Sequence, residues 1–130
     1  MTYSFNREPV SGVIIVTVEL EDRHSLKMLL DTGASRTTID STALYMTEYQ
    51  FGKNLGVATV ETANGIVEVE EYETGIISSL GIERKNFFIQ VYDFLAHGIL
   101  SDYDGVLGLD FFENTVLCIN LKENTITVSK

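Results

Sequence analysis

The stretch Leu29-Leu30-Asp31-Thr32-Gly33-Ala34-Ser35 places a carboxylate between an apolar run and a turn of small residues. Burying a lone carboxylate costs several kcal/mol unless it is paired or hydrogen-bonded, so an aspartate in this context needs compensating partners. Gly33 permits a tight turn and lets its backbone N–H approach an anion, while Thr32 and Ser35 supply hydroxyls. The stretch therefore indicates either a functional carboxylate or an Asx-type turn between two strands.

Short strands are expected on both sides of this turn. Residues 13–20 are β-branched and are followed by a polar cluster, and residues 26–30 return as their partner strand. After the turn, residues 36–39 favour another short strand. Residues 41–46 favour a brief helix capped by Asp40 or Ser41.

A hairpin is expected in the middle of the chain. Residues 57–72 alternate around Asn64-Gly65, a dipeptide that favours a type I′ turn, so the tip should lie at 62–65. Further strands are expected at 86–92, 115–121 and 125–128, with an irregular stretch at 93–104. Many short strands with almost no helix predict an all-β barrel or sandwich.

Length and charge limit the classes of function. The 130 residues contain one proline and no linker-like stretch, so we expect a single domain over residues 1–130. Lys and Arg number 9 against 19 Asp and Glu, a formal charge of −10 that disfavours binding to nucleic acid or to an anionic membrane. The N-terminus has no basic region, and the apolar residues 13–18 are too few to span a membrane, so a cytoplasmic location is expected.

Metal and disulfide chemistry are not expected. The single cysteine, Cys118, excludes an internal disulfide, and its position in the apolar run 116–119 predicts a buried core thiol. His24 and His97 lie far apart in the sequence without nearby ligand partners. We therefore expect no metal and no cofactor.

Three features, in the same order along the chain, resemble the retropepsin-like aspartic proteases. Residues 30–35 match the active-site motif, and residues 104–112 match the second hallmark of two apolar residues, a glycine and a short helix. The hairpin tip lies where that family has its flap. The resemblance covers roughly residues 12 to 128. It implies a closed acid-protease-like β-barrel with a flap hairpin and one short C-terminal helix.

The chemistry of such an enzyme needs two carboxylates close together, one protonated and one ionised, and aspartic proteases are the standard example of a shared-proton dyad. Asp-Thr-Gly occurs once in this chain, so the resemblance implies a homodimer in which Asp31 faces its symmetry mate. Glu73-Thr74-Gly75 is superficially similar, but it follows an alternating, half-exposed strand and is not expected to provide the second carboxylate.

The resemblance also assigns roles to individual residues. Asp31 would be the catalytic carboxylate, Thr32 would link the two active-site loops across the dimer, and Gly33 would offer its N–H to the carboxylates. The remaining residues fall into three groups: loop support by Ala34 and Ser35; a flap closing over an extended peptide, made of Thr62, Ala63, Asn64, Gly65 and Ile66; and backing of the loop by Val106, Leu107 and Gly108.

Two positions depart from the retroviral pattern. Ser35 and Leu109 stand where retroviral members commonly have an aspartate and its arginine partner, which makes the chain more similar to the cellular and prokaryotic members. Asp102 and Asp104 are expected to be solvated loop acids, and Asp110 to accept hydrogen bonds from helix or loop amides.

The sequence therefore predicts an aspartic endopeptidase acting on an extended peptide or protein. The first alternative is a non-catalytic peptide- or protein-binding β-barrel module with the same fold, and the second is a purely structural or assembly subunit.

Overall fold

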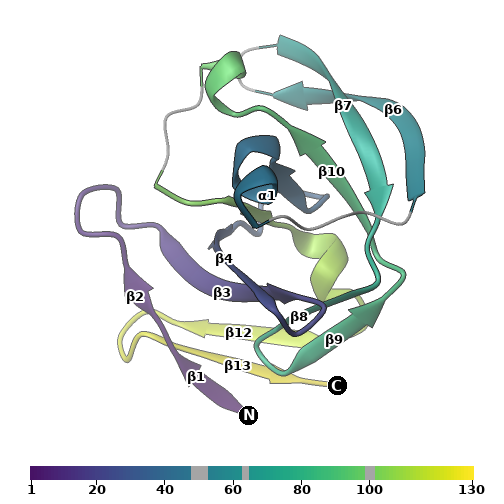
Figure 1. Cartoon of the computed structure of the whole chain (residues 1–130). Coiled ribbons are helices and arrows are strands. Elements are labelled where there is room, and N and C mark those ends of the chain that lie inside the picture. Colours follow the sequence, from purple (N-terminus) through teal and green to yellow (C-terminus); the bar gives the residue numbers. More distant parts are fainter. Residues whose placement is uncertain (48–52, 63–64, 99–101) are drawn as a thin grey trace.

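The computed structural model describes residues 1–47, 53–62, 65–98 and 102–130. Most of these residues lie in strands, and the elements follow one another along the chain as shown in Figure 1. The elements are β1 (Thr2–Ser4), β2 (Asn6–Arg7), β3 (Ile14–Leu20), β4 (His24–Leu30), β5 (Thr38–Asp40), α1 (Ser41–Thr47), β6 (Lys53–Thr62), β7 (Gly65–Glu73), β8 (Ile76–Ser79), β9 (Ile82–Lys85), β10 (Phe88–Tyr92), η1 (Leu95–His97), β11 (Gly105–Leu107), η2 (Leu109–Phe112), β12 (Val116–Asn120) and β13 (Thr125–Ser129).

The strands form two sheets. The larger sheet has the order β6-β7-β10-β5-β11-β4-β3-β8-β9, with β2 added beside β3, and the smaller has the order β1-β13-β12. In Figure 1 the smaller sheet lies below the larger one, and both chain termini are found there. The expectation of a mainly β domain is confirmed.

The core comes mainly from residues of the larger sheet, and the smaller sheet packs against it. Strands β3 and β4 alternate between buried and more exposed residues, because one face of each strand packs inward. Val18, Leu20 and Met28 are fully buried there, and Ile126 of β13 closes the core from the smaller sheet. Partly buried Leu117 packs against the same core from β12.

The β6–β7 hairpin is present and longer than expected. The two strands pair antiparallel from Lys53↔Glu73 to Thr62↔Gly65, with an irregularity in register between Asn54 and Gly56. Residues 53–56 are therefore part of the hairpin, which begins before the expected start at residue 57. The tip residues Ala63 and Asn64 lie outside the described part of the chain.

The closed barrel that was expected is not found among the described residues. The path of paired strands begins at β6 and ends at β9, and these two strands do not pair with each other. Only residues Glu70 to Glu73 of β7 pair with β10, so most of the hairpin extends beyond the sheet instead of returning to close it. At the other end of the path, β8 and β9 form a small hairpin. Its turn contains Leu80 and Gly81, both with positive φ.

The prediction of a buried Cys118 is wrong. This thiol is exposed, because β12 alternates and directs Leu117 and Ile119 toward the core while Cys118 faces outward. Cys118 pairs in register with Thr127 of β13. The apolar run of four residues therefore predicted a strand correctly, but it did not predict which side chains of that strand face inward.

Two expected helices are present. Helix α1 covers Ser41–Thr47, and Oδ1 of Asp40 lies 3.4 Å from the backbone N–H of Thr42 at its start. The expected C-terminal helix is the 3₁₀ helix η2.

Among the residues described, no helix is both long and apolar enough to cross a membrane.

Candidate active site

Asp31 directly follows β4, in the part of the larger sheet where β11 lies between β4 and β5. Strand β11 pairs in parallel with β4, with Leu107 opposite Leu30, and pairs antiparallel with β5 on its other side. The two strands that flank the Asp31 loop are therefore separated by a strand from much later in the chain. Parallel neighbours of this kind bring residues that are distant in sequence to the same edge.

The loop itself is closed by short hydrogen bonds. The N–H of Gly33 donates to Oδ1 of Asp31 at 2.8 Å, and the N–H of Ala34 donates to the carbonyl of Asp31 at 3.1 Å. The N–H of Asp31 donates to the carbonyl of Leu107 at 3.1 Å. The Asx-type turn therefore exists, and it presents the carboxylate instead of burying it. Asp31 is partly exposed, and Thr32 and Gly33 are exposed.

The segment after β11 lies directly behind the loop. The N–H of Leu109 donates to the carbonyl of Ala34 at 2.8 Å, and the N–H of Asp110 donates to the carbonyl of Ser35 at 3.3 Å. Gly108 makes the closest approach, since a Cβ there would lie 2.8 Å from the carbonyl oxygen of Arg36. A glycine is required at this point because a side chain would displace the loop backbone.

Thr37 joins the loop to η2 and was not identified from the sequence. Its side chain is fully buried, and its hydroxyl donates to Oδ1 of Asp110 at 2.7 Å. The hydroxyl oxygen of Thr37 also accepts the N–H of Gly108 at 3.1 Å. The N–H of Thr37 donates to Oδ2 of Asp110 at 3.0 Å. Asp110 also accepts the N–H of Phe111 at 2.9 Å, so its expected role as an acceptor for helix and loop amides is confirmed.

Arg36 connects the loop to two other elements. Its Nε lies 3.6 Å from Oδ2 of Asp110, and its Nη1 lies 3.4 Å from Oε1 of Glu71 on β7. The Arg36 side chain is 38% exposed, whereas those of Glu71 and Asp110 are 24% and 17% exposed. The loop is thus linked by charge to η2 and to the hairpin.

Helix η2 is held firmly against the core. The ring of Phe111 is fully buried and packs edge-on against Phe87 and Phe112, with centroids 5.9 and 5.3 Å apart. Such aromatic pairs contribute roughly 0.5–1.5 kcal/mol each beyond the area that they bury. Arg84 of β9 donates from Nε to the carbonyl of Phe111 at 3.0 Å and from Nη2 to that of Glu113 at 2.6 Å. Asp110 and its bonds to the loop therefore rest on a rigid base.

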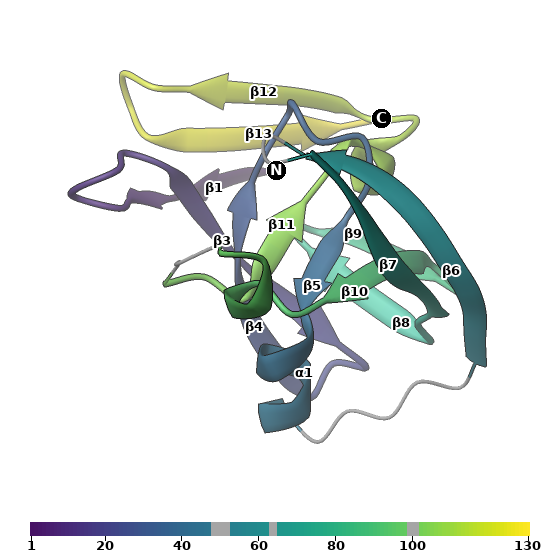
Figure 2. The ribbon, with the colours of Figure 1, turned by 90° about the horizontal axis from the view of Figure 1, so that it is seen from above.

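The hairpin extends from the same sheet. Figure 2 shows the end of β6 and the start of β7 on the side of the molecule that also carries the turn after β4 and strands β12 and β13. Ile66, one of the expected flap residues, is 76% exposed. Gly65 has a positive φ of 113°, a conformation that favours glycine next to a tight turn.

The other acids of interest have structural positions. Asp104 is not a solvated loop acid, since its Oδ2 accepts the N–H of Lys27 at 2.8 Å and its own N–H donates to the carbonyl of Lys27. Asp102 is exposed. In the segment 73–75, Thr74 is buried and its hydroxyl donates to the carbonyl of Phe87 at 3.1 Å.

No group of three or more His, Cys, Asp or Glu within the described part of the chain could hold a metal ion.

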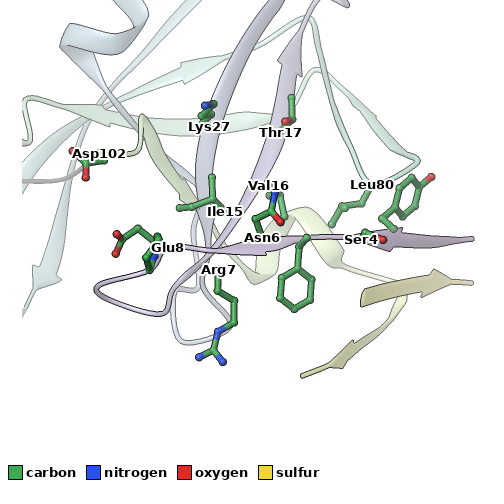
Figure 3. Close-up of a pocket in the computed structure, with 13 residues that line it drawn as sticks. Ser4, Asn6, Arg7, Glu8, Ile15, Val16, Thr17, Lys27, Leu80 and Asp102 are labelled. Atoms are coloured by element: carbon green, nitrogen blue, oxygen red, sulfur yellow. The ribbon is translucent and has the colours of Figure 1, made fainter. Parts of the chain in front are cut away.

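A cavity of about 590 Å³ lies between the N-terminal segment and strands β3 and β4. Figure 3 shows Lys27 and Thr17 on these strands, with Arg7 pointing to the opposite side. Glu8 and Asp102 also line it, but Asp31 does not. This cavity is therefore separate from the loop described above.

Comparisons with known proteins bear on the family and the fold of the chain. A family model described as gag-polyprotein putative aspartyl protease matches residues 16–114. The structure is similar to the crystal structure of a retropepsin-like aspartic protease from Rickettsia conorii, with a TM-score of 0.68 and 19% sequence identity over 99% of this chain and 92% of that one. At this identity the similarity establishes a common fold. No curated protein matches the sequence.

Proposed function

The chain belongs to the family of gag-polyprotein putative aspartyl proteases, and from this premise we propose that it is an aspartic endopeptidase. Its substrate would be an extended peptide or protein segment. Two Asp31 carboxylates, one from each of two copies of the chain, would activate the water that cuts the peptide bond. The observation that carries this proposal is the presentation of Asp31 on a braced, partly exposed turn.

The bracing matters because catalysis depends on positioning. The loop is fixed through the bonds of Asp31 to Leu107 and of Ala34 to Leu109, so little of it has to be ordered when substrate binds. The N–H of Gly33 already lies on Oδ1 of Asp31, where it stabilises negative charge on that oxygen. A carboxylate needed only for an Asx turn has no need of support from a strand so far along the chain.

A single Asp31 cannot perform both proton transfers. In the proposed dimer, one ionised carboxylate accepts a proton from water, whose oxygen attacks the scissile carbonyl carbon. The protonated carboxyl of the other chain donates its proton to the carbonyl oxygen, forming a neutral tetrahedral intermediate. Collapse of that intermediate breaks the C–N bond as the protonated carboxyl donates its proton to the leaving nitrogen, while one hydroxyl of the intermediate returns its proton to the other, ionised carboxylate. Atoms and charges balance, and the dyad again holds one proton.

Features of the single chain support this assembly. Thr32 is exposed beside Asp31 and is available to a second copy. The exposed Ile66 provides an apolar contact near the free end of the hairpin, where an extended peptide would pair with backbone groups. Closure of this hairpin would exclude water from the reacting bond.

Cleavage of a denatured, mixed-sequence protein substrate tests the proposal. Wild type, Asp31→Asn and the matched control Asp102→Asn would be compared from pH 4 to 7.5, and the cut sites identified by mass spectrometry. Asp102 is an exposed acid outside the loop, so its variant makes the same chemical change and should cut as wild type does. We expect the cuts to disappear only in Asp31→Asn.

Sedimentation of the wild type at pH 5 and pH 7.5, at low and high salt, tests the dimer. Each chain carries a formal charge of −10, so a dimer carries −20 and its two chains repel each other. This electrostatic repulsion weakens with added salt or as surface carboxylates become protonated. Association should therefore strengthen under those conditions. A protein that is dimeric but cuts nothing would contradict the enzymatic proposal and support a non-catalytic binding module.

A further inference from the structure

Arg36 stands at the junction of three elements that the proposed reaction needs to keep in register. It belongs to the segment that leads from the Asp31 loop into β5, and its guanidinium reaches Asp110 of η2 and Glu71 of β7. We infer that Arg36 is a positioning residue, which holds the base of the β6–β7 hairpin in a fixed place relative to the Asp31 loop. This inference rests on the proposed function, since it assigns the hairpin a part in substrate binding.

The place of Glu71 on β7 is the first support. Residues Glu70 to Glu73 pair with β10 on one side and with β6 on the other, whereas residues from Gly65 to Val69 pair with β6 alone. The hairpin therefore leaves the sheet next to Glu70. Glu71 lies one residue inside that boundary, so the ion pair acts where bending of the hairpin would begin.

The direction of the side chains is the second support. Strand residues alternate between two faces, so Glu71 shares its face with the buried Val69, and the exposed Glu68 lies on the other face. Because Glu71 contacts Arg36, this is the face of β7 that Arg36 approaches. Glu68 lies on the opposite face, away from that contact.

The fixed position of Arg36 itself is the third support. Its carbonyl packs against Gly108, and the preceding residue, Ser35, accepts the N–H of Asp110. The Asp110 carboxylate is in turn held by Thr37 and by the helix amide of Phe111. The guanidinium therefore extends from a rigid support, and the hairpin is the movable partner of the pair.

The two contacts of Arg36 act together. The contact with Asp110 links the loop to η2, and the contact with Glu71 extends that link to the hairpin.

A double-mutant cycle of Arg36→Gln and Glu71→Gln measures the proposed link. Glu71→Gln is the cleaner single change because it leaves the Arg36–Asp110 contact in place. Glu68→Gln is the matched control, since it removes one negative charge from the same strand on the opposite face. Two properties would be measured for each variant: KM and kcat for a peptide taken from the mapped cut sites, and hydrogen exchange of the backbone amides of β7.

Partly exposed ion pairs contribute modestly, so we expect KM to rise by about 1.5- to fivefold in Glu71→Gln, with a smaller change in kcat. Amides of residues 65–70 should exchange faster by a similar factor, and Glu68→Gln should match wild type. The double variant should equal Arg36→Gln alone, because the link is already absent in that background.

Equal exchange in Glu71→Gln and Glu68→Gln, or strictly additive effects in the cycle, would overturn the inference. A wild type that cuts no substrate would instead contradict the proposed function, and hydrogen exchange alone would then decide whether Arg36 restrains the hairpin.

Discussion

Replacing Thr37 by valine removes one hydroxyl from the interior while keeping nearly the same side-chain shape. Thr37 is 0% exposed, and its hydroxyl lies 2.7 Å from Oδ1 of Asp110 and 3.1 Å from the backbone nitrogen of Gly108. The substitution therefore tests two hydrogen bonds and leaves packing almost unchanged. Both bonds join the Asp31 loop to the segment behind it.

The magnitude follows from these two bonds. A buried donor left unsatisfied, here the N–H of Gly108, costs about 1–3 kcal/mol, and a hydrogen bond to a charged group contributes about 1.5–3 kcal/mol. The two effects overlap because they share one oxygen, and Asp110 keeps its bonds from the N–H groups of Thr37 and Phe111. We therefore expect Thr37→Val to lower the free energy of unfolding by about 2–4 kcal/mol.

Thr37→Ser is the matched comparison. Serine keeps the hydroxyl and both bonds but loses one methyl group, which costs about 1 kcal/mol in a packed interior. Urea unfolding of the two variants gives the free energies, and an unchanged m-value shows that each still unfolds as wild type does. Substrate cleavage, measured where both remain folded, should fall further in Thr37→Val because the loop that carries Asp31 loses its link to η2.

The relative stability of Thr37→Val and Thr37→Ser tests the role given to the Thr37 hydroxyl. If Thr37→Ser is less stable than Thr37→Val, methyl packing outweighs the hydrogen bonds, and the role given to the Thr37 hydroxyl is wrong. Equal stability of Thr37→Val and wild type would contradict it as well.

Two further predictions concern backbone contact and pH. Gly108→Ala would place a Cβ 2.7 Å from the carbonyl carbon of Arg36 and 2.9 Å from the carbonyl oxygen of Ala34, so we expect an unfolding free energy lower by about 1–3 kcal/mol; an unchanged Tm would contradict this. The hydroxyl and N–H of Ser11 hold the pKa of Glu8 below its ordinary value, so the turn gains stability above the unfolded pKa and loses it as pH falls through the lowered one. Carboxyl NMR titration should show this lowered pKa, and a midpoint at the ordinary value would refute it.

The strands and the hairpin could be predicted because their signals are local. Alternation and the Asn64-Gly65 dipeptide indicated the β6–β7 hairpin, and the β-branched run at 13–20 indicated β3. The inward face of β12 could not be predicted in the same way. Four apolar residues in succession suit either face, and the position of Cys118 depends on how β12 pairs with β13 and packs on the core.

The parts of the candidate site that were missed depend on long-range pairing. Thr37 and Asp110 are separated by 73 residues, and Asp104 and Lys27 by 77, so no local pattern links either pair. A threonine in a polar stretch gives no sign of complete burial. Only the insertion of β11 between β4 and β5 brings these groups together.

That insertion of β11 also affects when the Asp31 loop can gain its support during synthesis of the chain. Asp31 is made long before Leu107, Gly108 and Asp110, which support its loop. Contacts between such distant segments form late because a long loop must close first. A nascent or C-terminally truncated chain would carry the Asp-Thr-Gly motif without its support. The order of synthesis thus delays the assembly of the site until residues 105–112 have been made.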